Sequence, residues 1–564
     1  MIFSVYIGVM FVRVKTTPNS PKRSVQIVEN CRKDGKVKQR IVRYVGAALN
    51  DRELKALKDL AEVIKAEMEQ EVQPGLFSPQ EIAEKAIISR DAKEEEESLR
   101  VNLKKLREEQ RITLGIHEVY GKLYCQLGFD EVPGKSQMMK KSRSNLKHIV
   151  LARNASPLSK RATVKELSDH FGVDISLSSV YRTMDHLDDK IIDRIKDTAL
   201  YSAQQLFGIN LRVLFYDCTT LYFESFKEDE LKNNGYSKDL KFNQPQVLLA
   251  LLVTESGIPV GYEVFPGCTF EGHTLQTAIE RVESKYNISD LVIVADSAML
   301  GKDNLKWLED HGKRYIVGAR LKSLSKVQQE KVLNTEYYRD YTGELYNRVA
   351  DIPYGDKCRL VVSYSEKRAK KDRDDRETAL EKLTGKLKKS KNPLSFGGSY
   401  GYKRFLKTAS EAVVEIDEKK VNEAAMWDGL HGVITNIKDM TAEQIREHYH
   451  GLWQVEESFR ITKHDLKIRP VYHWTPKRIK AHIAICFMSL TLARHLMYRT
   501  KLQYHSMSAE EIRRNLSSVQ LSILKDVSTN KRYGVPSAIT PEAAKLYKIM
   551  AINWSPVPFE IKSN

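Results

Sequence analysis

The chain has 564 residues, with 91 Lys and Arg against 74 Asp and Glu and a formal net charge of +17. This length predicts several domains, and the excess of cations favours a polyanionic partner, because each neutralised phosphate releases counterions. The six cysteines are scattered without a Cys-x-x-Cys pair, which argues against a disulfide framework and a zinc site. No apolar run approaches the roughly 20 residues of a membrane span.

Residues 1–50 are predicted to form a small basic β unit. Three runs alternate with period two, at 10–15, 25–29 and 39–45. The excess of Lys and Arg in this unit favours an arm that faces phosphates, although a solvated hairpin has the same pattern. The residues before Met10 lack the basic start and the Ala-x-Ala site of a signal peptide, and we expect an upstream start codon to explain them.

Residues 51–205 have a mainly helical period, and we expect a DNA-binding region there. Within it, 163–187 has the pattern of a helix-turn-helix: a capped helix from Thr163, a break at Gly172 and a second helix from Ser178. The second helix would present three side chains to a DNA groove: Ser179, Arg182 and Thr183. A plain pair of helices explains the pattern equally well.

From residue 206 the period changes to that of an α/β domain. Apolar, β-branched runs alternate with helical stretches in the order β-β-β-α-β-α-β, which is the order of an RNase H-like fold with a mixed sheet. In that fold the first strand lies beside the fourth. The predicted division is a first core part at 206–318, an inserted β-rich subdomain at 319–440, a second core part at 441–500 and a C-terminal helical region at 501–564.

Three carboxylates are candidates for a metal-binding catalytic site: Asp217, Asp296 and Glu456. Asp217 and Asp296 each end a short apolar run, and an Asp there lies at the carboxyl edge of a sheet, where open α/β sheets place their chemistry. Glu456 lies in a later helix-like stretch. Three carboxylates from separate elements can hold two divalent cations, which drive in-line displacement at phosphorus. Hard oxygen ligands suit Mg²⁺, with Mn²⁺ as a substitute.

The stretch around Glu456 combines this acid with an aromatic ring and cations. At 100° per residue, one helix face would carry Tyr449, Leu452, Glu456, Arg460, Lys463 and Lys467. A metal-bound phosphate needs acids for the ions and bases for the flanking phosphates. Pairing of Glu456 with Arg460 and Lys463 on a solvated surface would give the same pattern. The two Asp residues at strand ends favour the functional interpretation.

The same residues resemble a known signature. Tyr449, Glu456 and Lys463 fit the Tyr-x2-Arg-x3-Glu-x6-Lys pattern of one superfamily of bacterial insertion-sequence DDE transposases, whereas Leu452 stands at the Arg position. The stretches that begin at Asp217 and Asp296 resemble the two Asp blocks of that superfamily. The likeness covers nearly the whole chain.

The resemblance implies a reaction and a set of roles. Element ends would be hydrolysed, and the freed 3′-OH would attack target DNA. Asp217 would bridge two Mg²⁺ ions, and Asp296 and Glu456 would each hold one. The expected DNA contacts are Tyr449, Arg460, Lys463, Lys467, Lys238 and Arg182.

The expected partners are double-stranded DNA, as terminal inverted repeats and as target, and a second copy of the chain on that DNA. We expect a cytoplasmic, nucleoid-associated protein with no membrane partner. Two alternatives remain: a structure-selective nuclease of the same fold, and a non-enzymatic DNA-binding repressor. The repressor would leave the three carboxylates unexplained.

Overall fold

The computed structural model describes residues 9–16, 20–33, 36–72, 78–98, 101–207, 212–224, 227–235, 243–285, 291–297, 301–341, 346–389, 404–410 and 413–562. The chain divides into two compact units. Unit 1 comprises Met1–Gln110, Ser522–Val535 and Val557–Asn564, and unit 2 comprises Arg111–Leu521 and Pro536–Pro556. Within the described ranges, no helix has the length and apolar character needed to cross a membrane.

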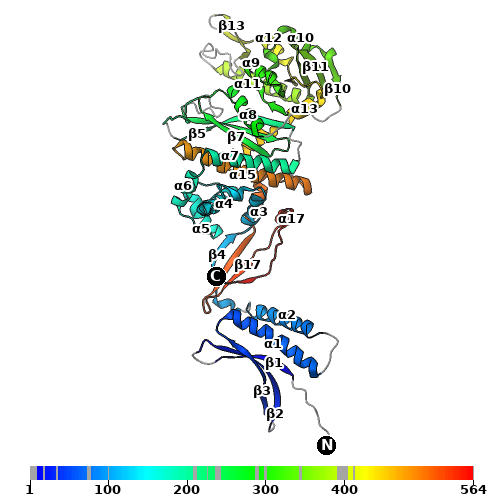
Figure 1. Ribbon diagram of the computed structural model, residues 1–564. Coiled ribbons are helices and arrows are strands. Elements are labelled where there is room, and N and C mark those ends of the chain that lie inside the picture. Colours follow the sequence, from blue (N-terminus) through cyan, green and yellow to red (C-terminus); the bar gives the residue numbers. More distant parts are fainter. Residues whose placement is uncertain are drawn as a thin grey trace. The chain divides into compact units, whose positions relative to one another are not determined.

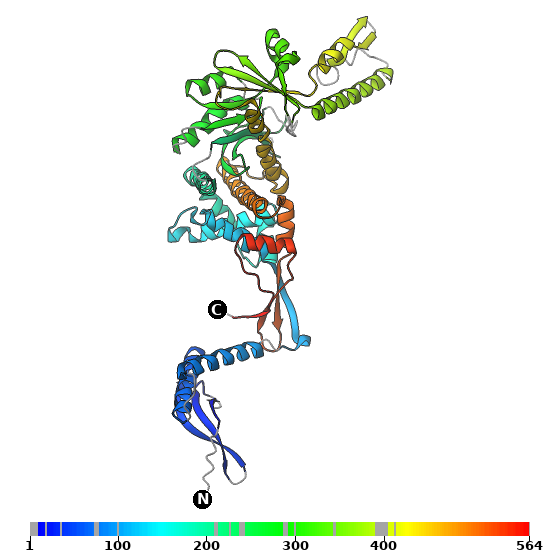
Figure 2. The ribbon, with the colours of Figure 1, turned by 90° about the vertical axis from the view of Figure 1, so that its right-hand side faces the viewer.

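Unit 1 contains the predicted N-terminal β unit. Its antiparallel sheet consists of β1 (Met10–Thr16), β2 (Arg23–Lys33) and β3 (Lys36–Ala48), so the alternating runs are confirmed as strands. The helix α1 (Asp51–Val72) packs along this sheet, and α2 (Pro79–Ser98) packs against α1 (Figure 2). Val25, Ile27 and Ala61 are fully buried between sheet and helix. The folded unit therefore continues beyond residue 50.

A second sheet has the order β18-β17-β16-β4. Its strands are β4 (Leu106–Thr113), β16 (Gln520–Asp526), β17 (Arg532–Pro536) and β18 (Phe559–Ile561). The expectation of a purely helical C-terminal region is therefore wrong. These strands are short and partly exposed, and their partner β4 lies far away in the sequence, so no local pattern revealed them.

Unit 2 is built on a nine-stranded mixed sheet of order β10-β11-β12-β15-β9-β8-β5-β6-β7. Its first five strands in sequence are β5 (Val213–Tyr222), β6 (Gln246–Thr254), β7 (Pro259–Pro266), β8 (Val292–Ala295) and β9 (Arg314–Ala319). Helices α8 (Leu275–Lys285) and α9 (Lys302–Asp310) connect β7 to β8 and β8 to β9. The predicted β-β-β-α-β-α-β order is confirmed, and β5 pairs in parallel with β8.

The central strands of the sheet are buried on both faces. Alternate residues of β5 enter separate clusters: Leu214 and Tyr216 pack with side chains of α8 and α9, whereas Phe215 packs on the opposite side. On that second side lie α7 (Asp189–Phe207) and α15 (Pro476–Gln503), which run beside β7 (Figure 1). Double-sided burial explains why the strands read as continuous apolar runs.

The region 319–440 continues this sheet. Its strands β10 (Tyr338–Asp340), β11 (Arg348–Tyr354), β12 (Cys358–Tyr364) and β15 (Leu430–Thr435) are joined to the core through antiparallel pairing of β15 with β9. Of the strands described in this region, β13 (Leu406–Ser410) and β14 (Val413–Ile416) form a separate two-stranded sheet. Between them and β12 lies α11 (Glu366–Lys389). Strands are present as expected, but they extend the core sheet instead of forming a sheet apart.

The helices before β5 include α3 (Gly115–Gln126), α4 (Lys140–Ala155), α5 (Lys160–Phe171) and α6 (Leu177–Asp185). The helices α5 and α6 flank Gly172, whose φ of 64° ends α5. Ser179 and Thr183 are buried, and both accept hydrogen bonds from the Asn145 amide of α4, at 2.8 and 3.2 Å. The expectation that they face a DNA groove is therefore wrong, because α4 covers that side of α6. Arg182 is exposed.

Candidate active site

Two of the three carboxylates lie side by side where β8 ends: Asp296 directly follows β8, whereas Asp217 lies within β5 and does not end its strand as the apolar run predicted. The parallel register of β5 and β8 pairs Tyr216 with Ala295, so Asp217 and Asp296 occupy the next position on each strand. Neighbouring strands are about 4.8 Å apart. The Cys218 N–H donates to Asp217 Oδ1 at 2.7 Å, and the Ser297 N–H donates to Asp296 Oδ1 at 2.6 Å. Backbone donors thus orient both carboxylates.

The third carboxylate comes from a helix that packs on β5. Glu456 lies in the first turn of α14 (Trp453–Arg460) and is exposed. Val455 and Phe459 of the same helix are buried in the core. Gly451, just before α14, allows close approach, because a Cβ there would overlap the Phe215 ring of β5. The absent side chain therefore lets the Glu456 helix lie directly on the Asp217 strand.

Tyr449 of α13 (Ala442–His450) links these elements. Its hydroxyl donates to Asp296 Oδ1 at 3.5 Å, a weak contact. Gly318 of β9 makes room for it, because a Cβ there would overlap the hydroxyl and lie 3.1 Å from the Ser297 nitrogen. Burial raises the pKa of Tyr449, and the carboxylates of Asp296 and Glu456 add to this effect. The phenol therefore lies within electrostatic reach of both acids and stays protonated.

A half-buried cation, Arg446, contacts the Tyr449 ring. The Arg446 guanidinium lies 5.5 Å from the ring centroid, and its Nη1 donates to His431 Nδ1 at 3.0 Å. Burial lowers the pKa of Arg446 to about 10, and burial together with Arg446 lowers the pKa of His431 to about 3. His431 is therefore a neutral acceptor at pH 7, and Arg446 is engaged with protein groups.

The predicted continuous helix face is wrong. A turn at Gly451 and Leu452 separates α13 from α14, and a π-helical turn (Ile461–Asp465) follows α14. Leu452 is only 6% exposed and packs in the core, so it does not occupy a phosphate-facing position. Lys467 lies beyond the helix with a φ of 44°. The rotation of 100° per residue applies only within an α-helix, so residues on either side of these breaks do not share the predicted face.

The predicted DNA-binding cations have different environments. Arg460 is exposed and pairs with Glu457 at 3.5 Å and Asp465 at 3.7 Å. Arg460 thus pairs with residues other than Glu456, against the simple i,i+4 alternative. Lys463 is half-buried in the π-helical turn, and Lys467 is exposed. Lys238 lies outside the described residues.

Carboxylate oxygens are the donors that a hard divalent cation prefers, so the chemistry of this edge fits such an ion. In the described part of the chain, however, no three His, Cys, Asp or Glu side chains are grouped closely enough to hold a metal ion. The parallel register brings Asp217 and Asp296 together. Glu456 lies on the helix packed beside them without completing such a cluster.

Arg494 of α15 is a positioning residue that sequence reasoning missed. It is 4% exposed, and its guanidinium donates to the Gly257 carbonyl at 2.6 Å, to Glu457 Oε2 at 2.6 Å and to the Gln454 amide oxygen. Gly257 has a φ of 75°, and a Cβ there would overlap Arg494. Arg494 therefore ties the Glu456 helix to the β6–β7 turn. The one sign of this role in the sequence was that Arg494 is a single charged residue at the end of an apolar helical stretch, 483–493.

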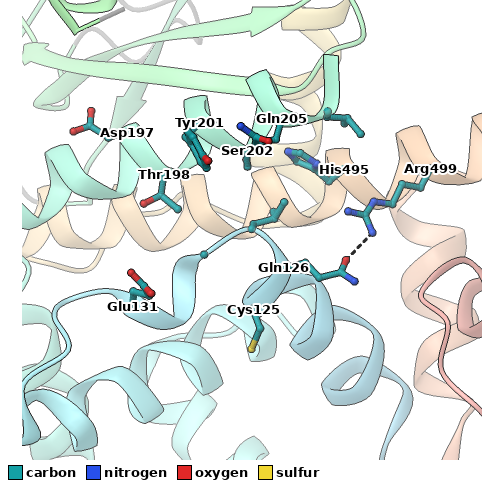
Figure 3. A pocket seen from close by; sticks show the side chains of 13 residues that line it. Cys125, Gln126, Glu131, Asp197, Thr198, Tyr201, Ser202, Gln205, His495 and Arg499 are labelled. Carbon is teal, nitrogen blue, oxygen red and sulfur yellow. Dashed lines mark hydrogen bonds between the residues drawn. The ribbon is translucent and has the colours of Figure 1, made fainter. Parts of the chain in front are cut away.

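A cavity of about 730 Å³ lies elsewhere, among α3, α7 and α15 (Figure 3). Its lining includes His495 and Arg499 but none of the three carboxylates. His495 is 1% exposed, and neither ring nitrogen has a hydrogen-bond partner among the residues that the structure describes. Arg499 donates to Gln126 Oε1 at 2.8 Å. This cavity is separate from the acidic edge.

Comparisons with known proteins identify the family of the chain. Residues 210–492 match the family model of the transposase DDE domain, and residues 11–75 match that of the N-terminal domain of IS1634 family transposases. No curated protein matches the chain. A solved "Mos1 transposase paired-end complex with left transposon end" is 14% identical, with a TM-score of 0.14 over 30% of this chain. The chain spans 57% of the length of that relative. Because the DDE domain model covers half of the sequence, the chain belongs to the DDE transposases of insertion sequences.

Proposed function

We propose that the protein binds the terminal inverted repeats of its own insertion sequence, cleaves the element ends and joins the 3′-OH ends to target DNA. The parallel register that places Asp217 beside Asp296, with the Glu456 helix packed on the same strand, carries this proposal. The family of the chain supports the reaction class. The strand order β7-β6-β5-β8-β9 supports an RNase H-like catalytic core.

The roles of the residues follow from their positions. Asp217 and Asp296 would hold divalent cations, Mg²⁺ or its substitute Mn²⁺, and Glu456 would complete the ligands when DNA closes the site. Such ions, when bound, activate the attacking water or 3′-OH and stabilise the leaving oxygen. Tyr449 orients Asp296 through its hydroxyl. Arg460 at the end of α14 and Lys463 in the π-helical turn that follows bind phosphates beside the scissile bond.

The proposed partners are duplex DNA and a second copy of the chain on paired ends, in the cytoplasm at the nucleoid. The net charge of +17 supports the DNA partner. The exposed Arg182 on α6 is the groove-facing candidate of the helical region.

The test is cleavage of a plasmid that carries the gene with its natural flanks. Asp217→Asn, Asp296→Asn and Glu456→Gln remove charge at constant shape, and each is expected to abolish Mg²⁺-dependent cleavage while DNA binding persists. Glu423→Gln, an exposed acid on α12 (Glu418–Ala425), is the matched control. Strong cleavage by any of the three variants would remove that residue from the site. Cleavage without end joining would favour the nuclease alternative.

A further inference from the structure

A second pocket in unit 2 is lined by cations and has no acid. It has a volume of about 510 Å³ and lies between α4, the start of α5 and the segment that leads from α14 to α15. We call it the basic pocket; its cations are Arg153, Lys160, Arg161, Lys467 and Arg469. No Asp or Glu occurs among its described lining residues.

Two of these cations are buried without a carboxylate. Arg153 and Lys160 are each 5% exposed. Arg153 donates only to backbone carbonyls, of Leu158, Leu466 and Lys467, and its Nε has no partner. Among the described residues, no ion pair joins either side chain to an acid. An uncompensated buried charge costs several kcal/mol, so this arrangement indicates an anion that the folded protein alone does not supply.

The side chain that contacts the Lys160 ammonium group is a neutral histidine, His482, and not a carboxylate. His482 Nε2 donates to the Ile468 carbonyl at 2.9 Å, which leaves Nδ1 as the acceptor for Lys160 Nζ at 3.4 Å. Burial and the Arg153 guanidinium lower the pKa of Lys160 to about 7. By contrast, Arg478 at the start of α15 pairs with both Asp185 oxygens, at 2.7 and 2.8 Å. The positive charge of Arg478 is therefore balanced by Asp185, whereas no carboxylate balances the cations that line the basic pocket.

The walls of the basic pocket are attached to the active-site elements. The Arg153 Nη1 donates to the Leu466 carbonyl at 2.8 Å, directly after the π-helical turn. Val471, two residues beyond the pocket cation Arg469, forms a parallel bridge with Phe223, just after the Asp217 strand. A ligand held in the pocket is thus fixed to the same strand and helix that carry Asp217 and Glu456.

We propose that the basic pocket binds a backbone phosphate of the DNA strand that passes the active site. This inference rests on the proposed function. Phosphate oxygens supply the missing negative charge and accept several N–H donors at once. The exposed Tyr472 ring at the rim, 62% exposed, offers a face on which a neighbouring base stacks. A free inorganic phosphate has the same oxygen chemistry, and the test separates the two sources.

The first arm measures the melting temperature of the full chain in sodium phosphate and in sodium chloride at equal ionic strength. Phosphate is expected to raise the melting temperature of the wild type but not of Lys160→Met. In chloride, Lys160→Met is expected to be as stable as the wild type or more stable, because an unpaired buried charge is lost. Lys480→Met is the control, since Lys480 pairs with Asp189 at 3.0 Å outside the pocket. An equal phosphate effect in Lys160→Met would overturn the pocket.

The second arm measures binding of a fluorescent DNA duplex over a range of salt. Loss of one phosphate contact should lower the slope of log K against log[salt] by about 0.9. Lys160→Met and the exposed Lys467→Met are both expected to show this loss, and Lys480→Met is not. Duplex binding with unchanged slopes would overturn the inference and leave the proposed function standing. A phosphate effect without a slope change would assign the pocket to a free anion instead of DNA. Failure of the wild type to bind DNA would overturn the proposed function, and with it the DNA ligand.

Discussion

Arg494 and Glu457 form a partly buried ion pair 2.6 Å long, and Glu457 directly follows Glu456 on α14. Successive helical residues point about 100° apart. Glu456 therefore faces solvent while its neighbour holds the helix to α15 and to the β6–β7 turn. Two adjacent acids thus have different environments: Glu457 is tied to Arg494, whereas Glu456, the proposed metal ligand, is exposed.

This division predicts opposite phenotypes. Glu457→Ala leaves the buried Arg494 without its acid but with its bonds to Gly257 and Gln454, so we expect a loss of about 1.5 to 3 kcal/mol in the free energy of unfolding. Glu456→Gln, at an exposed position, should leave that free energy nearly unchanged while abolishing cleavage. Urea denaturation and a cleavage assay on both variants provide the measurement. A stable, inactive Glu457→Ala would show instead that Glu457 acts in the chemistry.

Leu452 stands where the related signature has Arg, and its burial predicts that Arg is not accepted. Leu452→Arg would place a charge in the core beside Val455, and we expect destabilisation by several kcal/mol. Leu452→Met conserves volume and should cost less than about 1.5 kcal/mol. Thermal unfolding of the two variants decides the matter. Wild-type stability in Leu452→Arg would mean that the side chain reaches solvent and that this helix start differs from the packing described.

The lack of a side chain at Gly318 lets the Tyr449 hydroxyl reach Asp296, and we expect this contact to matter for cleavage. In Gly318→Ala the new methyl group would displace the Tyr449 hydroxyl from Asp296, and misplacement near a catalytic group can cost on the order of 10²-fold in rate. The variant is expected to cleave poorly yet bind DNA normally. Gly301→Ala is the control, because a Cβ there meets nothing within 4 Å. Full cleavage by Gly318→Ala would show that the Tyr449 contact with Asp296 is dispensable.

Because His495 is buried, we expect the free energy of unfolding to fall as the solution is made more acidic. Burial, aided by the charge of Arg499, lowers its pKa from 6.5 to about 3. As the pH falls below 6.5 the unfolded chain gains a proton that the folded chain does not take up until about pH 3, so stability declines across this window. At pH 5 the loss is on the order of 2 kcal/mol.

The measurement is the free energy of unfolding at pH 7 and pH 5. His495→Phe should remove this part of the decline, whereas His505→Phe, at an exposed position, should behave as the wild type does. An identical pH dependence in His495→Phe and the wild type would refute the assignment.

The sequence was sufficient to predict the first five strands of the core sheet and to place Asp217 and Asp296 on neighbouring strands. Strands buried on both faces are continuous apolar runs, and a carboxylate that ends such a run is conspicuous. Because adjacent parallel strands share one edge, the order of elements was enough to bring the two residues together. These features depend on local pattern and simple topology.

The positions of the side chains around Glu456 could not be predicted from the spacing of residues in the sequence. The turn at Leu452 and the π-helical turn at Ile461–Asp465 change the rotation per residue, and only packing against β5 and α15 determines them. Ser179 and Thr183 were misplaced for a similar reason: their polarity suggested exposure, while Asn145 of another helix satisfies both hydroxyls. Arg153 and Lys160 carry no local signal, because their significance lies in the acids that are missing around them.

The sheet of β4, β16, β17 and β18 draws its strands from both ends of the chain. A shortened protein that stops after the helical region would retain β4 but lack its partner β16. Its unpaired N–H and C=O groups would then form an open edge of the kind that promotes aggregation. A fragment that includes β4 therefore also needs the C-terminal strands to complete this sheet.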